Sequence, residues 1–332
     1  MAGRAFVTGG SGFVGGALIR RLVSGGAEVV ALARSDTAAM TLEALGARPV
    51  RGDLQDPSTL ATAMRGCDVA YHVAGVSRSC LRARDRSEML RTNVDGTRSV
   101  LRAAATAGVT RVVHTSSGAT IGERRGEVGR EDTRHRGGFL TDYERSKFEA
   151  ERAALDLGAE LGVDVVVVNP ASVQGPGRAD GSGRLLLLAM RGRPVPAIHT
   201  HLGIVDVEDC AAGHVLAAER GTPFRRYLLC GASPSTRELL EAIERVLGRR
   251  VRVAFVPGAL LSAAGSAGDA YARLTGRVPP VCRELARSGR HGHRYDGSRA
   301  VRELGLAYTP LEETLRRAAA WFEASGLLSP RR

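Results

Sequence analysis

The sequence contains almost no lysine. Of its 47 lysine and arginine residues, only Lys147 is a lysine. Arginine carries a planar, permanent charge, whereas lysine is a compact point charge on a flexible stem, with a pKa that shifts readily on burial. Because every other basic position in the chain is an arginine, Lys147 is a candidate functional residue whose chemistry arginine does not replace.

Aromatic residues are also scarce, at 4% of the 332 residues. Proteins that bind single-stranded nucleic acid stack bases on aromatic side chains, and the arginines behind the net charge of +12 are dispersed along this chain. We therefore expect no nucleic-acid partner, and we favour a phosphate-bearing cofactor or a small-molecule substrate.

Long apolar runs are missing as well. The longest, residues 163–173, contains Asp164 and is too short to span a bilayer. The N-terminal residues have no apolar stretch of the signal-peptide kind, and a strand pattern begins almost at once. The sequence therefore predicts a cytoplasmic protein with no membrane partner.

Cysteines are few, odd in number and widely spaced, with no C-x-x-C pair. They are Cys67, Cys80, Cys210, Cys230 and Cys282. This pattern argues against a disulfide scaffold or a zinc site and favours reduced thiols. Two histidine pairs, His199/His201 and His291/His293, have no carboxylate or cysteine immediately beside them. We predict no metal, and we expect surface or pocket-lining histidines, with the first pair as candidate substrate contacts.

What the sequence does contain is a regular alternation of strand and helix patterns. Strands are predicted at 4–10, 28–34, 47–53, 68–75, 110–117 and 163–170, and helices at 13–26, 37–46, 57–66, 86–107 and 142–161. Valine-rich strands without polar alternation are buried on both faces, as in a parallel sheet covered by helices. Right-handed crossovers then predict an α/β fold with a doubly wound parallel sheet of the Rossmann type.

The pattern changes after Pro170. Residues 171–184 are rich in glycine and proline and are predicted to form a loop. A strand and helix at 203–221 and a strand at 225–231 resemble the first part again. We therefore predict a dinucleotide-binding domain of residues 1–170, to which 203–231 return, and a smaller C-terminal substrate lobe of 171–202 and 232–332.

A glycine-rich turn joins the first strand to the first helix. Gly10-Ser11-Gly12-Phe13-Val14-Gly15 fits G-x-G-x-x-G in the strand–turn–helix context that a dinucleotide site requires. The glycines permit a tight turn and close approach of the backbone to a pyrophosphate, and the helix N-terminus favours its negative charge. The predicted contacts in this turn are Gly9, Gly12, Phe13, Val14 and Gly15.

The end of the second strand decides between the two nicotinamide cofactors. An acidic residue there holds the ribose 2′-hydroxyl of NAD, but this chain has Arg34-Ser35, which suits a 2′-phosphate. We favour NADP(H), and Asp36 keeps NAD(H) open. At the end of the third strand, Asp53-Leu54 is expected to meet the adenine, with helix capping as the alternative role of Asp53.

Seven motifs occur in the order of one known family. They are Thr8-Gly9-x-x-Gly12-x-x-Gly15, GDL at 52–54, HVAG at 72–75, NVDGT at 93–97, HTSS at 114–117, Tyr143-x-x-x-Lys147 and GPG at 175–177. The chain resembles the extended short-chain dehydrogenase/reductase superfamily, that is, the NAD-dependent epimerase/dehydratase family and its dihydroflavonol-reductase-like branch. The resemblance covers essentially the whole chain.

The resemblance implies roles for particular residues. Ser117, Tyr143 and Lys147 are the expected catalytic residues, with Ser116 as the alternative to Ser117. Further expected cofactor contacts are Val73, Ala74, Gly75, Asn93, Tyr143, Lys147, Pro170 and Val173. Asn93 is expected to be mainly structural. A homodimer formed through helices 86–107 and 142–161 is also implied.

The spacing of Tyr143 and Lys147 is consistent with that chemistry. On a helix the two residues are four apart and share a face, and a nearby ammonium lowers the pKa of a phenol. In a reductase, Tyr143 donates a proton to the substrate oxygen held between Ser117 and Tyr143, while the nicotinamide supplies hydride.

The reaction is less specific than the family. Sugar epimerases read like R-x-x-N-x-Y-G-P where this chain has VVNPASVQGPG, with Gln174 in place of the tyrosine. We therefore favour an NADP(H)-dependent oxidoreductase acting on a ketone or alcohol. A nucleotide-sugar epimerase with tightly bound NAD is the alternative, and a dinucleotide-sensing regulator is the third possibility. Residues 123–138 are predicted to form either a functional lid or a disordered surface loop.

Overall fold

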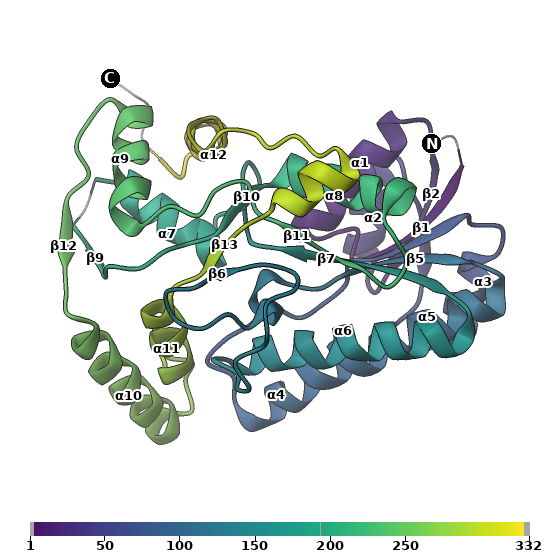
Figure 1. The fold of residues 1–332 in the computed structure, drawn as a ribbon, viewed down its shortest axis with the longest axis horizontal. Helices are drawn as coiled ribbons and strands as arrows, with labels where there is room; N and C mark the ends of the chain where they lie inside the picture. The colour runs from purple at the N-terminus through teal and green to yellow at the C-terminus, as the bar shows by residue number, and fades with distance from the viewer. Residues whose placement is uncertain (1–2, 193, 329–332) are drawn as a thin grey trace.

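The computed structural model describes residues 3–192 and 194–328. The predicted dinucleotide-binding domain therefore lacks its first two residues here, and the predicted C-terminal lobe lacks residues 193 and 329–332. A parallel seven-stranded sheet forms the centre of the molecule (Figure 1). Its strands, in spatial order, are β11 (Arg226–Leu229), β7 (Asp164–Pro170), β5 (Arg111–Thr115), β4 (Val69–His72), β1 (Arg4–Thr8), β2 (Glu28–Ala33) and β3 (Arg48–Arg51). This order confirms the predicted doubly wound sheet, and it reverses between β1 and β4, where such folds bind their ligands.

Helices cover both faces of the sheet. One face carries α1 (Phe13–Ser24), α2 (Asp36–Ala44) and α8 (Val207–Arg220), and the other carries α3 (Pro57–Met64), α5 (Gly96–Ala107) and α6 (Asp142–Leu161). Each face has its own cluster of buried aliphatic side chains, with strand residues that alternate between the two clusters. The valine-rich strands are therefore buried on both sides, as their composition predicted.

The predicted helix 86–107 is present but is not uniform. It begins with α4 (Ala83–Leu90), continues through a π-helical segment, η1 (Arg91–Asp95), and ends as α5. A π-helical segment rearranges the local backbone hydrogen bonds and often marks a functional site. Here the segment contains Asn93, which is buried.

The C-terminal residues form a smaller part with a core of its own. Helices α7 (Gly181–Met190), α9 (Thr236–Leu247) and α12 (Leu311–Ala324) share one buried cluster. Two small parallel sheets support them, formed by β8 (Ser172–Gln174) with β10 (Ile204–Asp206) and by β9 (Val195–Ala197) with β12 (Val253–Phe255). The prediction of a loop over 171–184 was therefore wrong in part, because β8 and the start of α7 lie within it.

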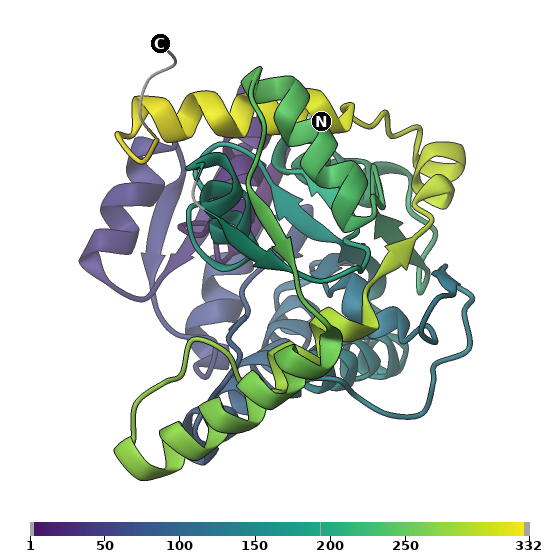
Figure 2. The same ribbon diagram turned by 90° about the vertical axis from the view of Figure 1, so that its left-hand side faces the viewer.

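The remaining elements lie along one side of this C-terminal part. Helices α10 (Gly258–Thr275) and α11 (Arg283–His291) pack against each other, and Figure 2 shows α10 projecting from the body of the protein. A second π-helical segment, η3 (Ala300–Leu304), precedes α12. Among the described residues, no helix is both long and apolar enough to cross a membrane.

The segment 123–138 is held by the C-terminal part of the chain. Within it β6 (Val128–Gly129) pairs in parallel with β13 (Arg294–Tyr295). Arg130 forms an ion pair with Asp296 at 2.9 Å beside this pairing. The segment is therefore an ordered part of the fold rather than a free surface loop, and its role as a lid stays a prediction.

Candidate active site

The glycine turn between β1 and α1 leaves room for backbone contacts. Gly9 has a φ of +72°, and a Cβ there would lie 2.6 Å from the backbone nitrogen of Ala74. A Cβ on Gly15 would collide with the carbonyl of Gly9. The N-terminus of α1 follows at Phe13, and in the described structure no side chain caps it. Its amides remain available for a diphosphate, so the turn fits a dinucleotide.

Two arginines lie where the ribose of the adenosine is expected. Arg34 directly follows β2, is exposed and forms no ion pair with the described residues. Arg51, at the end of β3, lies opposite Ala33 in the strand register. Asp36 is the acidic residue for which NAD(H) stayed an alternative cofactor, and its Oδ1 is 3.7 Å from Arg51 Nε. Ser35 accepts a hydrogen bond from the amide of Ala38 and caps α2.

The residues that follow the third strand, β3, offer fewer side-chain contacts to an adenine than the sequence suggested. Asp53 is exposed and accepts a hydrogen bond from the amide of Gln55 at 2.9 Å. Asp56, not Asp53, caps α3. The side chain of Leu54 is 5% exposed and packs in the core beside Gly96. Any contact of Leu54 with an adenine therefore involves its backbone.

The residues after β4 line the point where the strand order reverses. The amides of Val73 and Ala74 donate to the carbonyl and the hydroxyl of Thr8, at 3.3 and 3.2 Å. Asn93 holds Val76 by two hydrogen bonds, one to its amide and one to its carbonyl, at 2.7 and 3.0 Å. Asn93 therefore fixes the backbone of this wall, in agreement with its expected structural role.

Tyr143, Lys147 and Ser117 converge at the carboxyl ends of β4 and β5. Thr141 caps α6 through the amide of Glu144, which starts the helix just before Tyr143. Ser117 and Ser77 lie close enough to the hydroxyl of Tyr143 for their side chains to lower its pKa. Lys147, one turn further along α6, is 4% exposed and donates to the carbonyl of Thr115 at 2.6 Å.

Burial dominates the electrostatics of this group. It raises the pKa of Tyr143 above its ordinary value, and hydrogen bonds with Ser117 and Ser77 and the charge of Arg178 oppose that rise. Burial also lowers the pKa of Lys147 to about 8, against the opposing effect of Glu151. The pKa of Tyr143 is thus not lowered overall, because the desolvation of the phenolate outweighs the opposing hydrogen bonds and charge. An effect of Lys147 on this pKa stays a prediction.

Ser116 does not face the same way as Ser117. Its hydroxyl donates to the buried carboxylate of Glu151 at 2.5 Å. The same carboxylate accepts from Asn169 at 2.7 Å and pairs with Arg226 at 2.7 Å. Ser116 belongs to a buried polar network beneath the site, so the geometry favours Ser117 as the hydroxyl that meets a substrate.

The GPG turn supplies a residue that the sequence interpretation missed. Arg178 directly follows this turn, lies over the ring of Phe13 at 5.5 Å and acts electrostatically on Tyr143. Its position after the motif was the available signal. Ser77, two residues after the HVAG motif, was missed because nothing local marks it. Of the other predicted contacts, Pro170 lies beside Gly118, and Val173 is 6% exposed within the core.

A disulfide bond joins the wall of the site to the C-terminal part. Cys80, in the segment after β4, is bonded to Cys282, which precedes α11. The prediction that all five cysteines are reduced was wrong, because a separation of 202 residues hides the pairing from the sequence. The other three, Cys67, Cys210 and Cys230, are free and buried.

The two histidine pairs lie close together in space. His199, His201 and His291 line one cavity of about 150 Å³. His199 stacks on Phe255, with ring centroids 4.2 Å apart. The second pair meets a carboxylate, Glu123, which the sequence placed about 170 residues away. In three dimensions a carboxylate therefore does accompany His291 and His293, contrary to the expectation from the sequence.

Known proteins share both the sequence and the fold. The sequence model of the NAD dependent epimerase/dehydratase family matches residues 5–230. The chain belongs to this family. The assignment confirms the resemblance to the extended short-chain dehydrogenases/reductases, and the protein is an NAD(P)-dependent enzyme of that type.

Relatives of this family member have been given reductase names. A protein of Synechocystis sp. named "Putative dihydroflavonol 4-reductase" is 36% identical, over 98% of this chain and 96% of its own. The 4-hydroxy-2-methyl-3-oxo-4-farnesyl-3,4-dihydroquinoline-1-oxide ketoreductase of Stigmatella aurantiaca is 34% identical, over 92% of each chain. These relatives support NAD(P)-dependent oxidoreduction of a small molecule.

Solved structures of related proteins include one in complex with a sugar nucleotide and NAD. The crystal structure of gox2253 has a TM-score of 0.83 and 32% identity, and covers 98% of this chain and 99% of its own. MoeE5 in complex with UDP-glucose and NAD has a TM-score of 0.74 and 26% identity, and the match covers 97% of this chain and 99% of MoeE5. The family and its neighbours therefore leave the reaction type open between reduction and epimerisation.

Proposed function

We propose that the protein is an NADP(H)-dependent oxidoreductase that interconverts a ketone and a secondary alcohol on a small-molecule metabolite. The observation that carries this proposal is the convergence of the Ser117 and Tyr143 hydroxyls beside the buried amine of Lys147. Two neighbouring hydroxyls can each turn an O–H toward a substrate carbonyl oxygen and so offer it two donors. Substrate would lie between this edge of the sheet and the C-terminal lobe.

The chain's own residues account for the proton. The carbonyl oxygen accepts hydrogen bonds from Ser117 and Tyr143, and Tyr143 transfers its proton to that oxygen as charge develops there. Ser117 and Ser77 then stabilise the phenolate by hydrogen bonds, and Arg178 stabilises it by charge. The ammonium of Lys147, one helical turn along α6, would add to this charge stabilisation. When bound, the nicotinamide supplies the hydride.

The preference for NADP(H) rests on the charge at the ends of β2 and β3. Arg34 follows β2 directly, and Arg51 ends β3 opposite Ala33. Asp36, which would compete for this position, is paired with Arg51. Two guanidinium groups at this edge favour a 2′-phosphate over a bare hydroxyl.

An epimerase that retains NAD is the second candidate. It is supported by the fold shared with MoeE5, which binds UDP-glucose and NAD. Against it stands Gln174, whose side-chain amide is taken up by the hydroxyls of Ser172 and Ser182 at 2.9 and 2.8 Å. We also propose that the protein acts in the cytoplasm as a homodimer formed through the exposed sides of α5 and α6.

Cofactor preference tests the proposal. Purified protein is assayed with a panel of ketones and sugar nucleotides, and the ratio of kcat/KM for NADPH over NADH is measured. We expect NADPH consumption, and Arg34→Ala should lower the ratio by about 10- to 100-fold, because one charge-assisted hydrogen bond is lost. Arg48→Ala, at the other end of β3, is the matched control and should leave the ratio unchanged.

Three results would contradict this proposal. A wild-type ratio at or below one would remove the NADP preference. Protein that carries NAD through purification and interconverts sugar nucleotides without net redox change would establish the epimerase instead. Protein that binds the cofactor and shows neither activity would support a sensor.

A further inference from the structure

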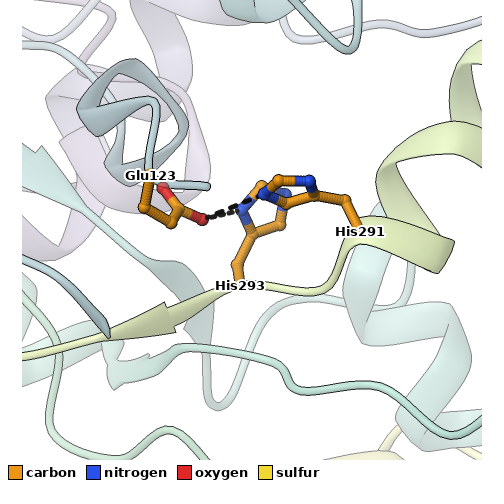
Figure 3. Close-up of side chains that lie close together, drawn as sticks. All are labelled: Glu123, His291 and His293. Carbon is orange, nitrogen blue, oxygen red and sulfur yellow. Dashed lines mark hydrogen bonds and ion pairs between the residues drawn. The ribbon is translucent and has the colours of Figure 1, made fainter. Parts of the chain in front are cut away.

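Glu123, His291 and His293 meet at the junction of two distant segments (Figure 3). Glu123 follows η2 (Gly118–Ile121), the short helical turn that Ser117 caps. His291 is the last residue of α11, and His293 precedes β13. Glu123 Oε1 is 2.7 Å from His293 Nδ1 and 3.8 Å from His291 Nε2.

Glu123 is buried, the two histidines are partly buried, and the cluster is only partly satisfied. Glu123 is 1% exposed, and the side chain of His291 is 9% exposed. Neither Glu123 Oε2 nor His291 Nε2 has a hydrogen-bond partner among the described residues. A buried polar atom without a partner costs about 1–3 kcal/mol, and more if it is charged. A ligand that binds both atoms would remove that cost.

We propose that Glu123, His291 and His293 form a binding site for a divalent metal ion of the zinc class. Each offers one ligand atom, and the three atoms lie within 4.8 Å of one another. Two imidazole nitrogens and one carboxylate oxygen are the donor set of many zinc sites that keep a fourth position open. With metal–ligand bonds of about 2 Å, modest side-chain movements close the site around one ion.

The surroundings of the cluster support its use as a ligand set. His293 Nε2 is 3.3 Å from the hydroxyl of Ser288, which orients the ring and leaves Nδ1 facing Glu123. Such outer hydrogen bonds fix the tautomer of a metal-binding histidine. The hydroxyl of Tyr295 is 3.0 Å from His293 Nδ1. The cavity lined by His199, His201 and His291 provides an entry path and room for a fourth ligand.

Nearby positive charge limits which ions fit. Arg136 donates to the backbone carbonyl of Glu123, but its guanidinium is paired with Glu144. The arginines on the cavity wall are exposed and therefore screened, and Glu127 lies among them. They are Arg125, Arg290 and Arg294. A hard cation held only by charge is disfavoured here, so we expect Zn²⁺ or Co²⁺, which imidazole suits, over Mg²⁺ or Ca²⁺.

A bound ion would connect two parts of the chain near the proposed active site. One ligand comes from the segment that follows Ser117, and the other two come from the junction of α11 and β13. The ion would act as a clip between the dinucleotide-binding sheet and the C-terminal part. The inference does not depend on the redox chemistry proposed above.

Metal titration of tag-free, chelator-treated full-length protein tests the site. Co²⁺ binding is followed by its visible absorption, and Zn²⁺ binding by calorimetry. We expect one ion per chain and no binding of Mg²⁺ or Ca²⁺ at the same concentrations. His291→Gln should weaken Zn²⁺ binding by more than about 100-fold, beyond the 10- to 100-fold cost of losing an outer partner. His199→Gln, in the same cavity but outside the cluster, is the matched control and should bind as the wild type does.

Two outcomes would overturn the proposal. One is the absence of Co²⁺ and Zn²⁺ binding by the wild-type protein at millimolar metal. The other is equal weakening by His291→Gln and His199→Gln, which would indicate nonspecific binding by surface histidines. Circular dichroism and NADPH binding of each variant verify folding. His293→Gln provides a second test should His291→Gln fail to fold.

Discussion

Lys147 is the residue at which the chain departs from its use of arginine, and its surroundings give the reason. It is 4% exposed, its Nζ donates to the carbonyl of Thr115, and a Cβ on Gly75 would lie only 3.5 Å from that nitrogen. A planar guanidinium needs more width and more partners than this space offers. The position therefore selects a small cation on a flexible stem.

The first residue-scale prediction exchanges lysine and arginine at two positions of α6. Lys147→Arg should lower kcat/KM for ketone reduction by at least about 100-fold, the scale of a lost acid–base contribution, as should Tyr143→Phe. Arg145→Lys, on the same helix but exposed and paired with Glu149, is the control and should retain activity. Wild-type turnover in Lys147→Arg would show that the lysine is not needed.

The second residue-scale prediction concerns pH. Burial lowers the pKa of Lys147 from 10.5 to about 8, so kcat/KM for reduction should fall as pH rises through about 8 and the ammonium is lost. Glu151 opposes the lowering of this pKa, so Glu151→Gln should move the fall to lower pH. A flat profile from pH 7 to 9.5 at saturating cofactor would contradict this assignment.

Lys147 should also affect the stability of the fold. Its contribution to stability should rise with pH, whereas kcat/KM should fall. Because the folded-state pKa lies below the unfolded one, the unfolded chain binds more protons between pH 8 and 10.5. The contribution of Lys147 to the free energy of unfolding therefore rises with pH across that window. Urea unfolding of the wild type and of Lys147→Gln, compared at pH 8 and pH 10, measures the difference.

At the scale of elements, the turn from β1 into α1 shows how backbone geometry sets the cofactor site. Gly15 and Gly16 are consecutive glycines in α1, but only the first is required by space. A Cβ on Gly15 would lie 2.7 Å from the carbonyl carbon of Gly9 and 2.9 Å from Gly10 Cα, whereas a Cβ on Gly16 meets nothing closer than 3.6 Å.

The two glycines give a matched pair of substitutions. Gly15→Ala should displace the turn and weaken NADPH binding at least about 10-fold, equivalent to about 1.4 kcal/mol. Gly16→Ala should bind NADPH normally and raise the free energy of unfolding by up to about 1 kcal/mol, because alanine favours a helix over glycine. Fluorescence titration with NADPH and thermal melting measure both. Equal NADPH affinity in the two variants would show that the turn does not hold the diphosphate.

At the scale of the whole molecule, the Cys80–Cys282 bond joins parts of the chain that the sheet does not connect. It fixes the segment after β4, which contains Ser77, to the start of α11. The amide of Cys80 and the amide of Asp142 both donate to Glu284, the second residue of α11, at 3.4 and 2.9 Å. The bond thus reinforces a contact that includes the start of α6, the helix that carries Tyr143 and Lys147.

Loss of this bond should destabilise the protein. Cys282→Ser should lower the free energy of unfolding by about 2–4 kcal/mol, because the disulfide restricts the unfolded chain. Thiol titration of unreduced, denatured wild type should find the three free cysteines, Cys67, Cys210 and Cys230. Five free thiols in protein purified without reductant would contradict the bond and agree with the reduced cysteines that the sequence predicted.

The sequence by itself determined the features that depend on neighbours along the chain. Alternating strand and helix patterns predicted the sheet, and α6 begins and ends where its pattern indicated, at Asp142 and Leu161. The glycine turn and the four-residue spacing of Tyr143 and Lys147 were readable because turns and helices are local structures. The segment 171–184 was misjudged because β8 is stabilised by pairing with β10, which lies about thirty residues further on.

Tertiary structure alone decided what depends on residues far apart in sequence. It brought Cys80 to Cys282, Ser77 to Tyr143, and Glu123 to the pair His291/His293. It also decided the pKa directions, because burial, which no local pattern reports, outweighs the neighbouring charges at both Tyr143 and Lys147. The physical reason is the same in each case: local patterns specify backbone conformation, whereas contact and desolvation arise only when the packed elements meet.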